Sequence, residues 1–173
     1  LKMKKKEIGN RMKEFYENRS KTFLTRRIPV IIRVDGKAFH TYTKSLEKPF
    51  DKGLIEDMNE TAIYLCKNIQ GAKCAYVQSD EISVLITDFD ELTTDAWFDY
   101  NVQKMCSISA SLATGIFNNF RLVRAIIKAN STLSSGECLD KIVFTEPNLA
   151  SFDSRVFNIP KETTSVNKRF YIF

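Results

Sequence analysis

Two acidic residues stand where strands of this chain are expected to end, and their type and placement suit metal chemistry. Asp35 closes the β-branched run Pro29–Asp35 and is followed directly by Gly36. Asp80, together with Glu81, stands between two further strand-like runs. Carboxylate oxygens from separate strand ends form the hard oxygen site that Mg²⁺ prefers, and this ion keeps other positions for water and phosphate. The spacing therefore predicts a magnesium site held by Asp35 and Asp80, with the Gly36 carbonyl as a further ligand.

Each of these carboxylates has an alternative interpretation as an ordinary turn residue. Aspartate, serine and glycine are common in turns, so Asp35 before Gly36 could be a turn aspartate, and Ser79-Asp80-Glu81 could be a polar hairpin turn. The two sites together are more specific than either alone. Turns without a function have no reason to place carboxylates on adjacent strand ends.

The loop that follows Asp35 is a candidate phosphate-binding segment. A turn that begins with glycine and enters a polar loop exposes backbone N–H groups, which can cradle a triphosphate. The residues of this loop are Gly36, Lys37, Ala38, Phe39 and His40. The histidine is the only one in the chain and has no obvious serine or cysteine partner, so packing or a phosphate contact is expected instead of a hydrolytic triad.

Two lysines outside this loop are further candidates for phosphate contact. Lys48 and Lys104 carry the charge that would neutralise a phosphate group. A single lysine is more often a solvated surface residue, and that alternative stays open for both.

The elements that must position these residues alternate between strands and helices. Four runs rich in apolar and β-branched residues predict strands: Pro29–Asp35, Lys73–Val77, Ile82–Thr87 and Phe152–Ile159, the last closed by Pro160. Two runs with apolar residues at helical spacing predict helices: Leu54–Ile69, which stops before Gly71, and a long helix that starts at Thr93–Asp95 and ends near Asn119. Leu122–Ala129 fits either a helix or a strand, and Ser131–Gly136 has the composition of a flexible loop.

This order of elements predicts an α+β fold. Strand, helix, strand, strand, helix, strand is the ferredoxin-like or split βαβ arrangement, with an antiparallel sheet and helices on one face. In it the first strand lies next to the hairpin formed by the second and third strands. We therefore expect Asp35 and Asp80 to lie at the same edge of the sheet.

The N-terminal segment is strongly basic. Residues 1–27 contain ten lysines and arginines against three glutamates, whereas the whole chain has a net charge of +5. Ile8, Met12, Phe15, Tyr16 and Phe23 recur at near-helical spacing and predict a helix from about Lys5 to Thr22 that packs on the body of the domain. A basic face of this kind suits nucleic acid, while a solvated helix face is the alternative.

Length and composition predict one globular domain over residues 1–173. Of these residues 43% are hydrophobic and 27% charged, and no apolar run approaches the length of a membrane span. We expect a soluble, intracellular and cytoplasmic protein without a membrane partner. The four cysteines lack C-x-x-C spacing, so reduced and mostly buried thiols are expected instead of a zinc site.

Four segments resemble, in the same order, the motifs of the tRNA-His guanylyltransferase family. They are Arg33–His40, Glu47–Asp51, Gln78–Glu81 and Phe152–Val156. The similarity runs from about Gly9 to Pro160 and is strongest to the bacterial, archaeal and phage branch, which polymerises RNA in the 3′-to-5′ direction. The pairing of the D-G-x-x-F-H motif with the S-D-E motif is specific to this family.

The resemblance implies a polymerase-palm catalytic domain that adds nucleotides to the 5′ end of tRNA, to repair that end or to add a guanylate to tRNA-His. The 5′ end is activated by adenylylation or already carries a triphosphate, and the 3′-hydroxyl of an incoming nucleoside triphosphate attacks it. The resemblance also implies two Mg²⁺ ions, ATP or GTP as activating and donor nucleotides, and a homo-oligomer, in this family a tetramer. The ions would activate the attacking hydroxyl and stabilise the leaving group, so no protein general base is required.

The same resemblance assigns roles to individual residues. Asp35, the Gly36 carbonyl and Asp80 would bind the metal ions, and Glu81 and Ser79 would support them; the implied catalytic residues are Asp35, Asp80 and Glu81. The implied nucleotide-binding residues are Gly36, Lys37, Ala38, Phe39, His40, Lys48, Asp51, Ser79 and Lys104. Members of the family continue into further helices that help bind tRNA, and because this sequence ends at Phe173 that extension is expected to be missing.

Two other functions compete with this interpretation. Nucleotide cyclases use the same palm, but their G-G-D-E-F hairpin is absent and Ser79-Asp80-Glu81 stands in its place. A non-catalytic RNA-binding remnant is the other alternative. The first would form a cyclic product from GTP alone, and the second would tolerate the loss of Asp80.

Overall fold

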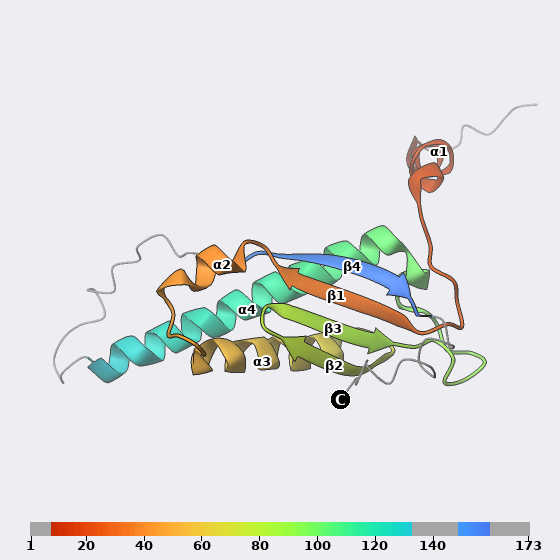
Figure 1. Ribbon diagram of the computed structural model, residues 1–173. Helices are drawn as coiled ribbons and strands as arrows, with labels where there is room; N and C mark the ends of the chain where they lie inside the picture. The colour runs from red at the N-terminus through yellow and green to blue at the C-terminus, as the bar shows by residue number, and fades with distance from the viewer. Residues whose placement is uncertain (1–7, 133–148, 160–173) are drawn as a thin grey trace, which may run out of the picture.

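The structure of the chain is a computed structural model that describes residues 8–132 and 149–159. Its elements, shown in Figure 1, are α1 (Ile8–Phe15), the 3-10 turn η1 (Glu17–Ser20), β1 (Val30–Gly36), α2 (Phe39–Tyr42), η2 (Thr43–Ser45), α3 (Lys52–Asn68), β2 (Ala72–Gln78), β3 (Glu81–Ile86), η3 (Trp97–Tyr100), α4 (Val102–Thr132) and β4 (Phe152–Asn158). The expected strands and the order of elements are confirmed. Pro160, residues 1–7 and most of the expected loop at 131–136 lie outside the described residues.

The four strands form one antiparallel sheet in the order β2-β3-β1-β4, and α3 and α4 cover one of its faces (Figure 1). This arrangement confirms the predicted α+β fold. Its other face, which we call the open face, carries no helix among the described residues.

Alternation along the strands separates the core from this open face. Val30, Ile32 and Val34 of β1 and alternate residues of β3 are fully buried against the helices. Arg33 and Asp35, which alternate with them, point to the open face and are only partly buried. The β-branched run therefore supplies both the core and the placement of Asp35.

Helix α3 begins and ends where its sequence predicts. The Leu54 N–H donates to the Asp51 carboxylate at 2.7 Å, which caps the first turn. Beyond the last turn, Gly71 has a φ of 81°, and a Cβ there would collide with the Thr87 carbonyl oxygen. Asp57 of α3 is buried and accepts from Arg121 at 3.1 Å and Arg124 at 2.8 Å, so it ties α3 to α4.

The predicted start of the long helix at Thr93–Asp95 is wrong. Helix α4 begins at Val102, because the Asn101 side chain accepts the Lys104 N–H at 3.0 Å and caps the first turn. Ahead of it, Phe98 and its neighbour have positive φ values of 50° and 52°, which a continuous α-helix excludes. The helix runs on to Thr132, so the segment 122–129 is helical.

The predicted N-terminal helix is shorter than expected, and its packing prediction is wrong. Helix α1 ends at Phe15, where Tyr16 leaves helical geometry with a φ of −122°. None of its residues is buried, and Ile8 is 79% exposed. The Val102 N–H donates to the Thr22 carbonyl, which holds the connection to α1 at the end of the sheet, and α1 stands clear of the body (Figure 1).

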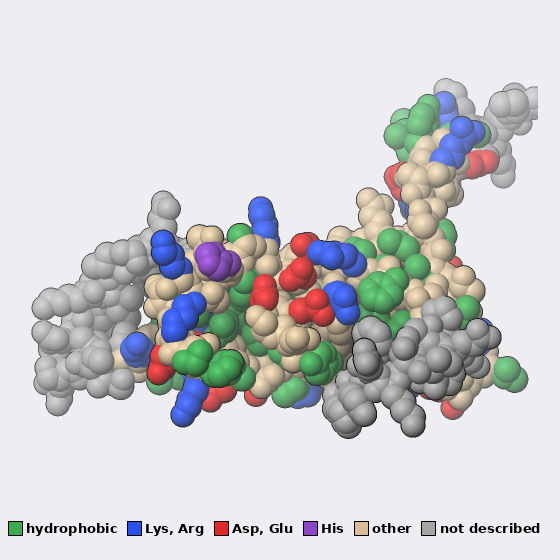
Figure 2. All heavy atoms as spheres, viewed as in Figure 1, with side chains coloured by type: hydrophobic (Ala, Val, Ile, Leu, Met, Phe, Trp, Pro, Cys, Tyr) green, Lys and Arg blue, Asp and Glu red, His purple; other side chains and the backbone are tan. Residues whose placement is uncertain are grey.

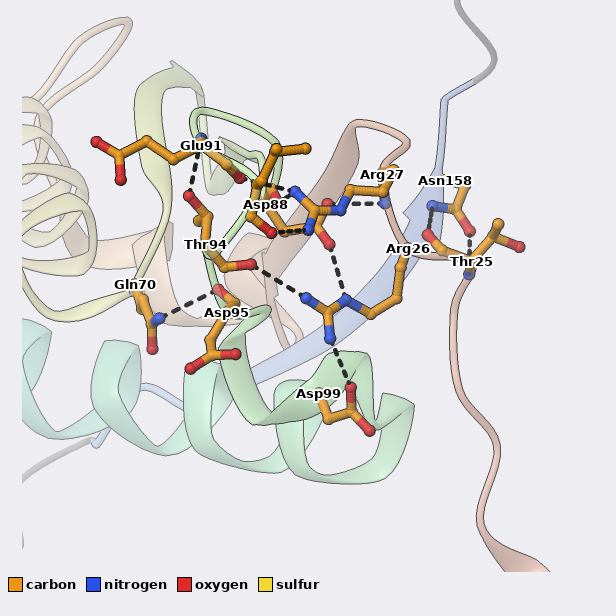
Figure 3. A network of polar contacts seen from close by, with 11 residues as sticks. Thr25, Arg26, Arg27, Gln70, Asp88, Glu91, Thr94, Asp95, Asp99 and Asn158 are labelled. Atoms are coloured by element: carbon orange, nitrogen blue, oxygen red, sulfur yellow. Dashed lines mark hydrogen bonds and ion pairs between the residues drawn. The ribbon is translucent and has the colours of Figure 1, made fainter.

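A dense polar network anchors the chain just before β1 (Figure 3). The Asp88 carboxylate is fully buried and accepts from Arg26 Nε and from the Arg27 N–H, both at 2.9 Å. The Arg27 guanidinium donates to three backbone carbonyls, those of Asp88, Glu91 and Leu92. This network fixes the entry into β1 at the end of the sheet opposite to Asp35.

No helix within residues 8–132 or 149–159 is both long enough and apolar enough to cross a lipid bilayer.

Candidate active site

The sheet brings together the two chain segments that carry Asp35 and Asp80. The Gly36 N–H donates to the Asp80 carbonyl at 3.1 Å, so the end of β1 lies directly beside the turn between β2 and β3. Asp35 is in register with Glu81 of β3 and with Asp153 of β4. Because cross-strand partners share a face, three carboxylates form one row on the open face, and Asp80 stands at the end of it.

The hairpin turn that carries Asp80 is tight. Gln78 and Glu81 pair across it, which leaves Ser79 and Asp80 as its two central residues, and Ser79 adopts a left-handed φ of 56°. The Asp80 side chain is half-buried, and its carboxylate has no hydrogen bond or ion pair to any part of the chain that the structure describes. Its oxygens are therefore open to a ligand.

An aromatic cluster in the core packs against the end of β1. Phe39 is buried and packs against Tyr42, Phe117 and Phe152, with ring centroids 5.0–5.7 Å apart. A Cβ on Gly36 would collide with the Phe39 ring, so only glycine fits at the end of β1. The side chain of Phe39 is thus part of the core, and only its backbone is available to a nucleotide.

The loop after β1 offers fewer free N–H groups than its sequence suggests. The Gly36 N–H is taken by the Asp80 carbonyl, and the Lys37 N–H donates to the Ser151 carbonyl at 2.8 Å. The N–H groups of residues 38–40 have no hydrogen-bond acceptor within residues 8–132 and 149–159. These three groups, together with the exposed side chains of Lys37 and His40, are what the loop can present to phosphate.

Two arginines form ion pairs with the carboxylate row. Arg155 Nη2 lies 3.4 Å from Asp35 Oδ2 and 3.5 Å from Asp153 Oδ1, and Arg33 Nε lies 3.1 Å from Glu81 Oε1. Figure 2 shows acidic side chains gathered on this face with basic side chains beside them. All these groups are at least one-third exposed, and exposed ion pairs contribute about 1 kcal/mol or less, so a cation can replace them.

The available donors fit a magnesium ion. The described residues hold no group of three or more histidine, cysteine, aspartate or glutamate side chains placed to bind a metal. The oxygens that a cation would meet here are the carboxylates of Asp35 and Asp80 and the carbonyl of Gly36. All of these are hard oxygens, and Mg²⁺ is held in this way when substrate phosphates and water complete its shell.

Asp51 and Lys48 lie in the segment that leads into α3. The Leu54 N–H bond lowers the pKa of the Asp51 carboxyl, although partial burial opposes this. Lys48 is exposed and donates to the Thr43 carbonyl at 3.4 Å. Asp51 therefore has a structural role as a helix cap, beside any contact with a nucleotide.

Lys104 is not brought to this cluster. It lies in the first turn of α4, and that turn is at the end of the sheet opposite to Asp35 and Asp80 (Figure 1). Its ammonium group lies 5.8 Å from the centre of the Phe98 ring. The loop 36–40 and the turn 79–81 lie at the end of β1, and Lys104 stands apart from them.

Reasoning from the residues alone did not identify Asp153, Arg155 and Arg33 as neighbours of the predicted site. Asp153, Arg155 and Phe157 alternate along β4 and so share one face. That alternation was a usable signal, but it needed the pairing of β4 with β1 to connect it to Asp35.

Comparisons with known proteins agree with this geometry. The model of the protein family described as tRNAHis guanylyltransferase matches residues 9–160. Two solved structures of a bacterial tRNA(His) guanylyltransferase-like protein, one in complex with ATP and one with GTP, are each 44% identical to the chain, with TM-scores of 0.75 and 0.74. They cover 92% and 91% of this chain, which spans 61% and 66% of theirs.

A viral relative extends the similarity. An uncharacterized protein of Acanthamoeba polyphaga mimivirus is 31% identical over 156 residues, which are 86% of this chain and 51% of that protein. The chain thus spans about half the length of the viral relative.

Proposed function

The chain belongs to the tRNAHis guanylyltransferase family, and from this membership and the arrangement of its carboxylates we propose that it is a metal-dependent nucleotidyltransferase acting on tRNA. It adds nucleotides to the 5′ end of tRNA in the 3′-to-5′ direction. The addition either repairs a shortened end or places a guanylate on tRNA-His. The active protein is a homo-oligomer, as the family suggests.

One observation carries this proposal: the hydrogen bond from the Gly36 N–H to the Asp80 carbonyl, which joins the end of β1 to the β2–β3 turn. It places Asp35 and Asp80 on adjacent chain segments at one edge of the sheet. Glu81, in register with Asp35, adds a third carboxylate on the same face. An ordinary turn has no need for this concentration of negative charge.

Asp35, Asp80 and the Gly36 carbonyl would hold Mg²⁺ in this proposal. The bound ions would supply charge that activates the attacking 3′-hydroxyl and stabilises the leaving phosphate. Glu81, kept in place by Arg33, holds the field at this edge negative and so favours a cation. Ser79 shapes the turn that exposes the Asp80 carboxylate.

The loop after β1 binds the triphosphate. The N–H groups of residues 38–40 and the side chains of Lys37 and His40 face it, while the buried Phe39 ring holds the loop rigid. Lys48 and Asp51 take part in the step that activates the 5′ end. The ATP and GTP bound to the bacterial relatives support a purine nucleoside triphosphate as the ligand.

The test is a 5′-extension assay on a tRNA transcript that lacks its first nucleotide. The protein is incubated with this transcript, Mg²⁺, ATP and each nucleoside triphosphate in turn, and the product is resolved on a sequencing gel. We expect growth at the 5′ end, with the added base set by the opposite strand in repair. Asp80→Asn should lower the rate about a thousandfold, since it removes a metal ligand.

A matched control separates the site from general charge effects. Asp90 is an exposed carboxylate beyond the end of β3 that is opposite to the Asp80 turn, paired with Lys73, and Asp90→Asn makes the same chemical change away from the site. It should keep full activity. A cyclic product from GTP without RNA, or full activity of Asp80→Asn, would contradict the proposal.

A further inference from the structure

The open face of the sheet is organised in two rows of opposite charge. Glu81, Asp35 and Asp153 are in register across β3, β1 and β4, and the neighbouring row on the same face contains Ser83, Arg33 and Arg155. Cross-strand neighbours of like charge repel one another, so the carboxylate row is stable only because the basic row lies against it.

The two arginines of the basic row are held very differently. Arg33 contacts Glu81 at 3.1 Å and Ser83 at 3.4 Å, and its guanidinium carbon lies 5.7 Å from the centre of the Phe157 ring. Arg155 contacts the carboxylate row through one nitrogen, which Asp35 and Asp153 share. It has no other partner in the part of the chain that the structure describes. Its side chain is 64% exposed. Arg33 is fixed, whereas Arg155 is free to turn.

We propose that Arg155 is the exchangeable counter-ion of the cation site, with Asp153 as the carboxylate that retains it when a divalent cation takes Asp35. This inference rests on the proposed function, because it assumes that Asp35 binds a cation. Arg155 occupies Asp35 Oδ2 when no cation is present and so competes with the ion. When the ion binds, the guanidinium leaves Asp35 and keeps its contact with Asp153, which stands one strand away on the same face.

This arrangement gives Asp153 and Arg155 positioning roles. Neither needs to contact the ion. Arg155 offsets the repulsion among the carboxylates when no cation is bound. Asp153 lowers the free-energy cost of releasing Asp35, because the guanidinium keeps an ionic partner throughout.

Direct measurement of cation binding tests the proposal without any use of activity. Mn²⁺ is titrated into the full chain, and the free ion is followed by electron paramagnetic resonance. Arg155→Gln should bind Mn²⁺ about three- to fivefold more tightly than the wild type, because it removes the competitor for Asp35. Asp153→Asn should bind more weakly by a similar factor, because Arg155 then relies on Asp35 alone.

The double variant Asp153→Asn/Arg155→Gln distinguishes an exchange of Arg155 between carboxylates from a general effect of charge on cation binding. If Asp153 acts through Arg155, Asp153→Asn should have a much smaller effect in the Arg155→Gln background than in the wild type. Arg33→Gln is the charge-matched control, since it removes the same charge from the same row without touching Asp35, and it should change Mn²⁺ affinity less than Arg155→Gln. Thermal unfolding followed by circular dichroism confirms that each exposed substitution leaves the fold intact.

The outcomes distinguish this inference from the proposed function. Independent effects of Asp153→Asn and Arg155→Gln, or equal effects of Arg33→Gln and Arg155→Gln, would overturn the exchange role alone. If Asp35→Asn and Asp80→Asn leave Mn²⁺ binding unchanged, the cation site itself fails and the exchange role fails with it.

Discussion

The two ends of the sheet use aspartate and arginine in opposite ways. At the end where β1 begins, the Asp88 carboxylate is fully buried and both of its oxygens accept at 2.9 Å. At the end where β1 finishes, the Asp35 side chain is 35% exposed and its ion pair with Arg155 is 3.4 Å long. The first carboxylate is saturated with short bonds, and the second is only loosely paired.

This difference separates structural charge from charge that is free to act. A buried pair leaves an uncompensated charge when one partner is removed, so it fixes the chain that surrounds it. An exposed pair costs little to break, because water replaces the lost partner. The row at Asp35 is therefore able to exchange an arginine for a cation, whereas the network at Asp88 is not.

Protonation follows the same division. Burial opposes ionisation of Asp88, but the bonds from Arg26 and the Arg27 N–H outweigh it and lower the pKa of this carboxyl below its usual range. The unfolded chain then takes up the proton first as the pH falls. The stability that Asp88 contributes is full above the ordinary aspartate range and is lost as the pH drops through the lowered value.

The same substitution at the two ends should have very different effects on stability. Asp88→Asn removes the charge that Arg26 and Arg27 surround, and we expect it to lower the free energy of unfolding by about 3 kcal/mol. Asp80→Asn removes a carboxylate that has no partner in the described residues and should change it by less than about 0.5 kcal/mol. Urea unfolding at pH 7 measures both values.

Acid sharpens this prediction. Because the pKa of Asp88 is lowered in the folded state, the gap between wild type and Asp88→Asn should shrink as the pH falls below about 4. Equal losses for Asp80→Asn and Asp88→Asn would remove the distinction between the two ends.

Glycine at the end of β1 offers a second comparison. Gly36→Ala places a methyl group against the buried Phe39 ring, and we expect a loss of about 1–3 kcal/mol in stability with a fall in nucleotidyl transfer. Gly115→Ala, in α4 with no heavy atom near its Cβ, should instead stabilise the protein by about 0.5–1 kcal/mol. Thermal unfolding of the two variants checks the sign of each effect.

A compensating change tests the cause. If the ring is what excludes a side chain at Gly36, then Phe39→Leu in the Gly36→Ala background should recover part of the lost stability. A loss that stays the same with the smaller residue would mean that the backbone, not Phe39, requires the glycine.

Local patterns were enough to predict the sheet, α3 and the strand ends that carry Asp35 and Asp80. Alternating β-branched residues mark the strands, and Gly71 marks the end of α3. The order of elements then limits the topology to one in which the first strand adjoins the hairpin. These short-range signals therefore sufficed to place Asp35 and Asp80 at the same edge of the sheet.

The features that the sequence did not predict depend on competition between equally good helix caps or on pairing between strands that are distant in the sequence. Thr94 and Asn101 are both good helix caps, but the Thr94 hydroxyl accepts the Glu91 N–H in a turn, and only Asn101 caps α4. The apolar spacing of α1 predicts a helix, but it does not predict whether the helix packs against the rest of the domain. Asp153 reaches Asp35 through the pairing of β4 with β1, which no local pattern encodes.

Asp51 lies between the two kinds of carboxylate, and its loss should cost less stability than the loss of Asp88. It is partly exposed, yet its oxygen caps α3, and Asp51→Ala should cost about 1 kcal/mol in urea unfolding. The Leu54 N–H bond lowers the pKa of Asp51, so this cost should fade as the pH drops through the lowered value.

Asp51→Asn then separates the cap from a role in nucleotide activation. Asparagine caps a helix about as well as aspartate, so it should keep nearly all of the stability that alanine loses. If nucleotidyl transfer also survives in Asp51→Asn, the residue acts as a cap alone. If transfer falls tenfold or more at unchanged stability, the charge of Asp51 belongs to the site, and this one carboxylate has both a structural and a functional role.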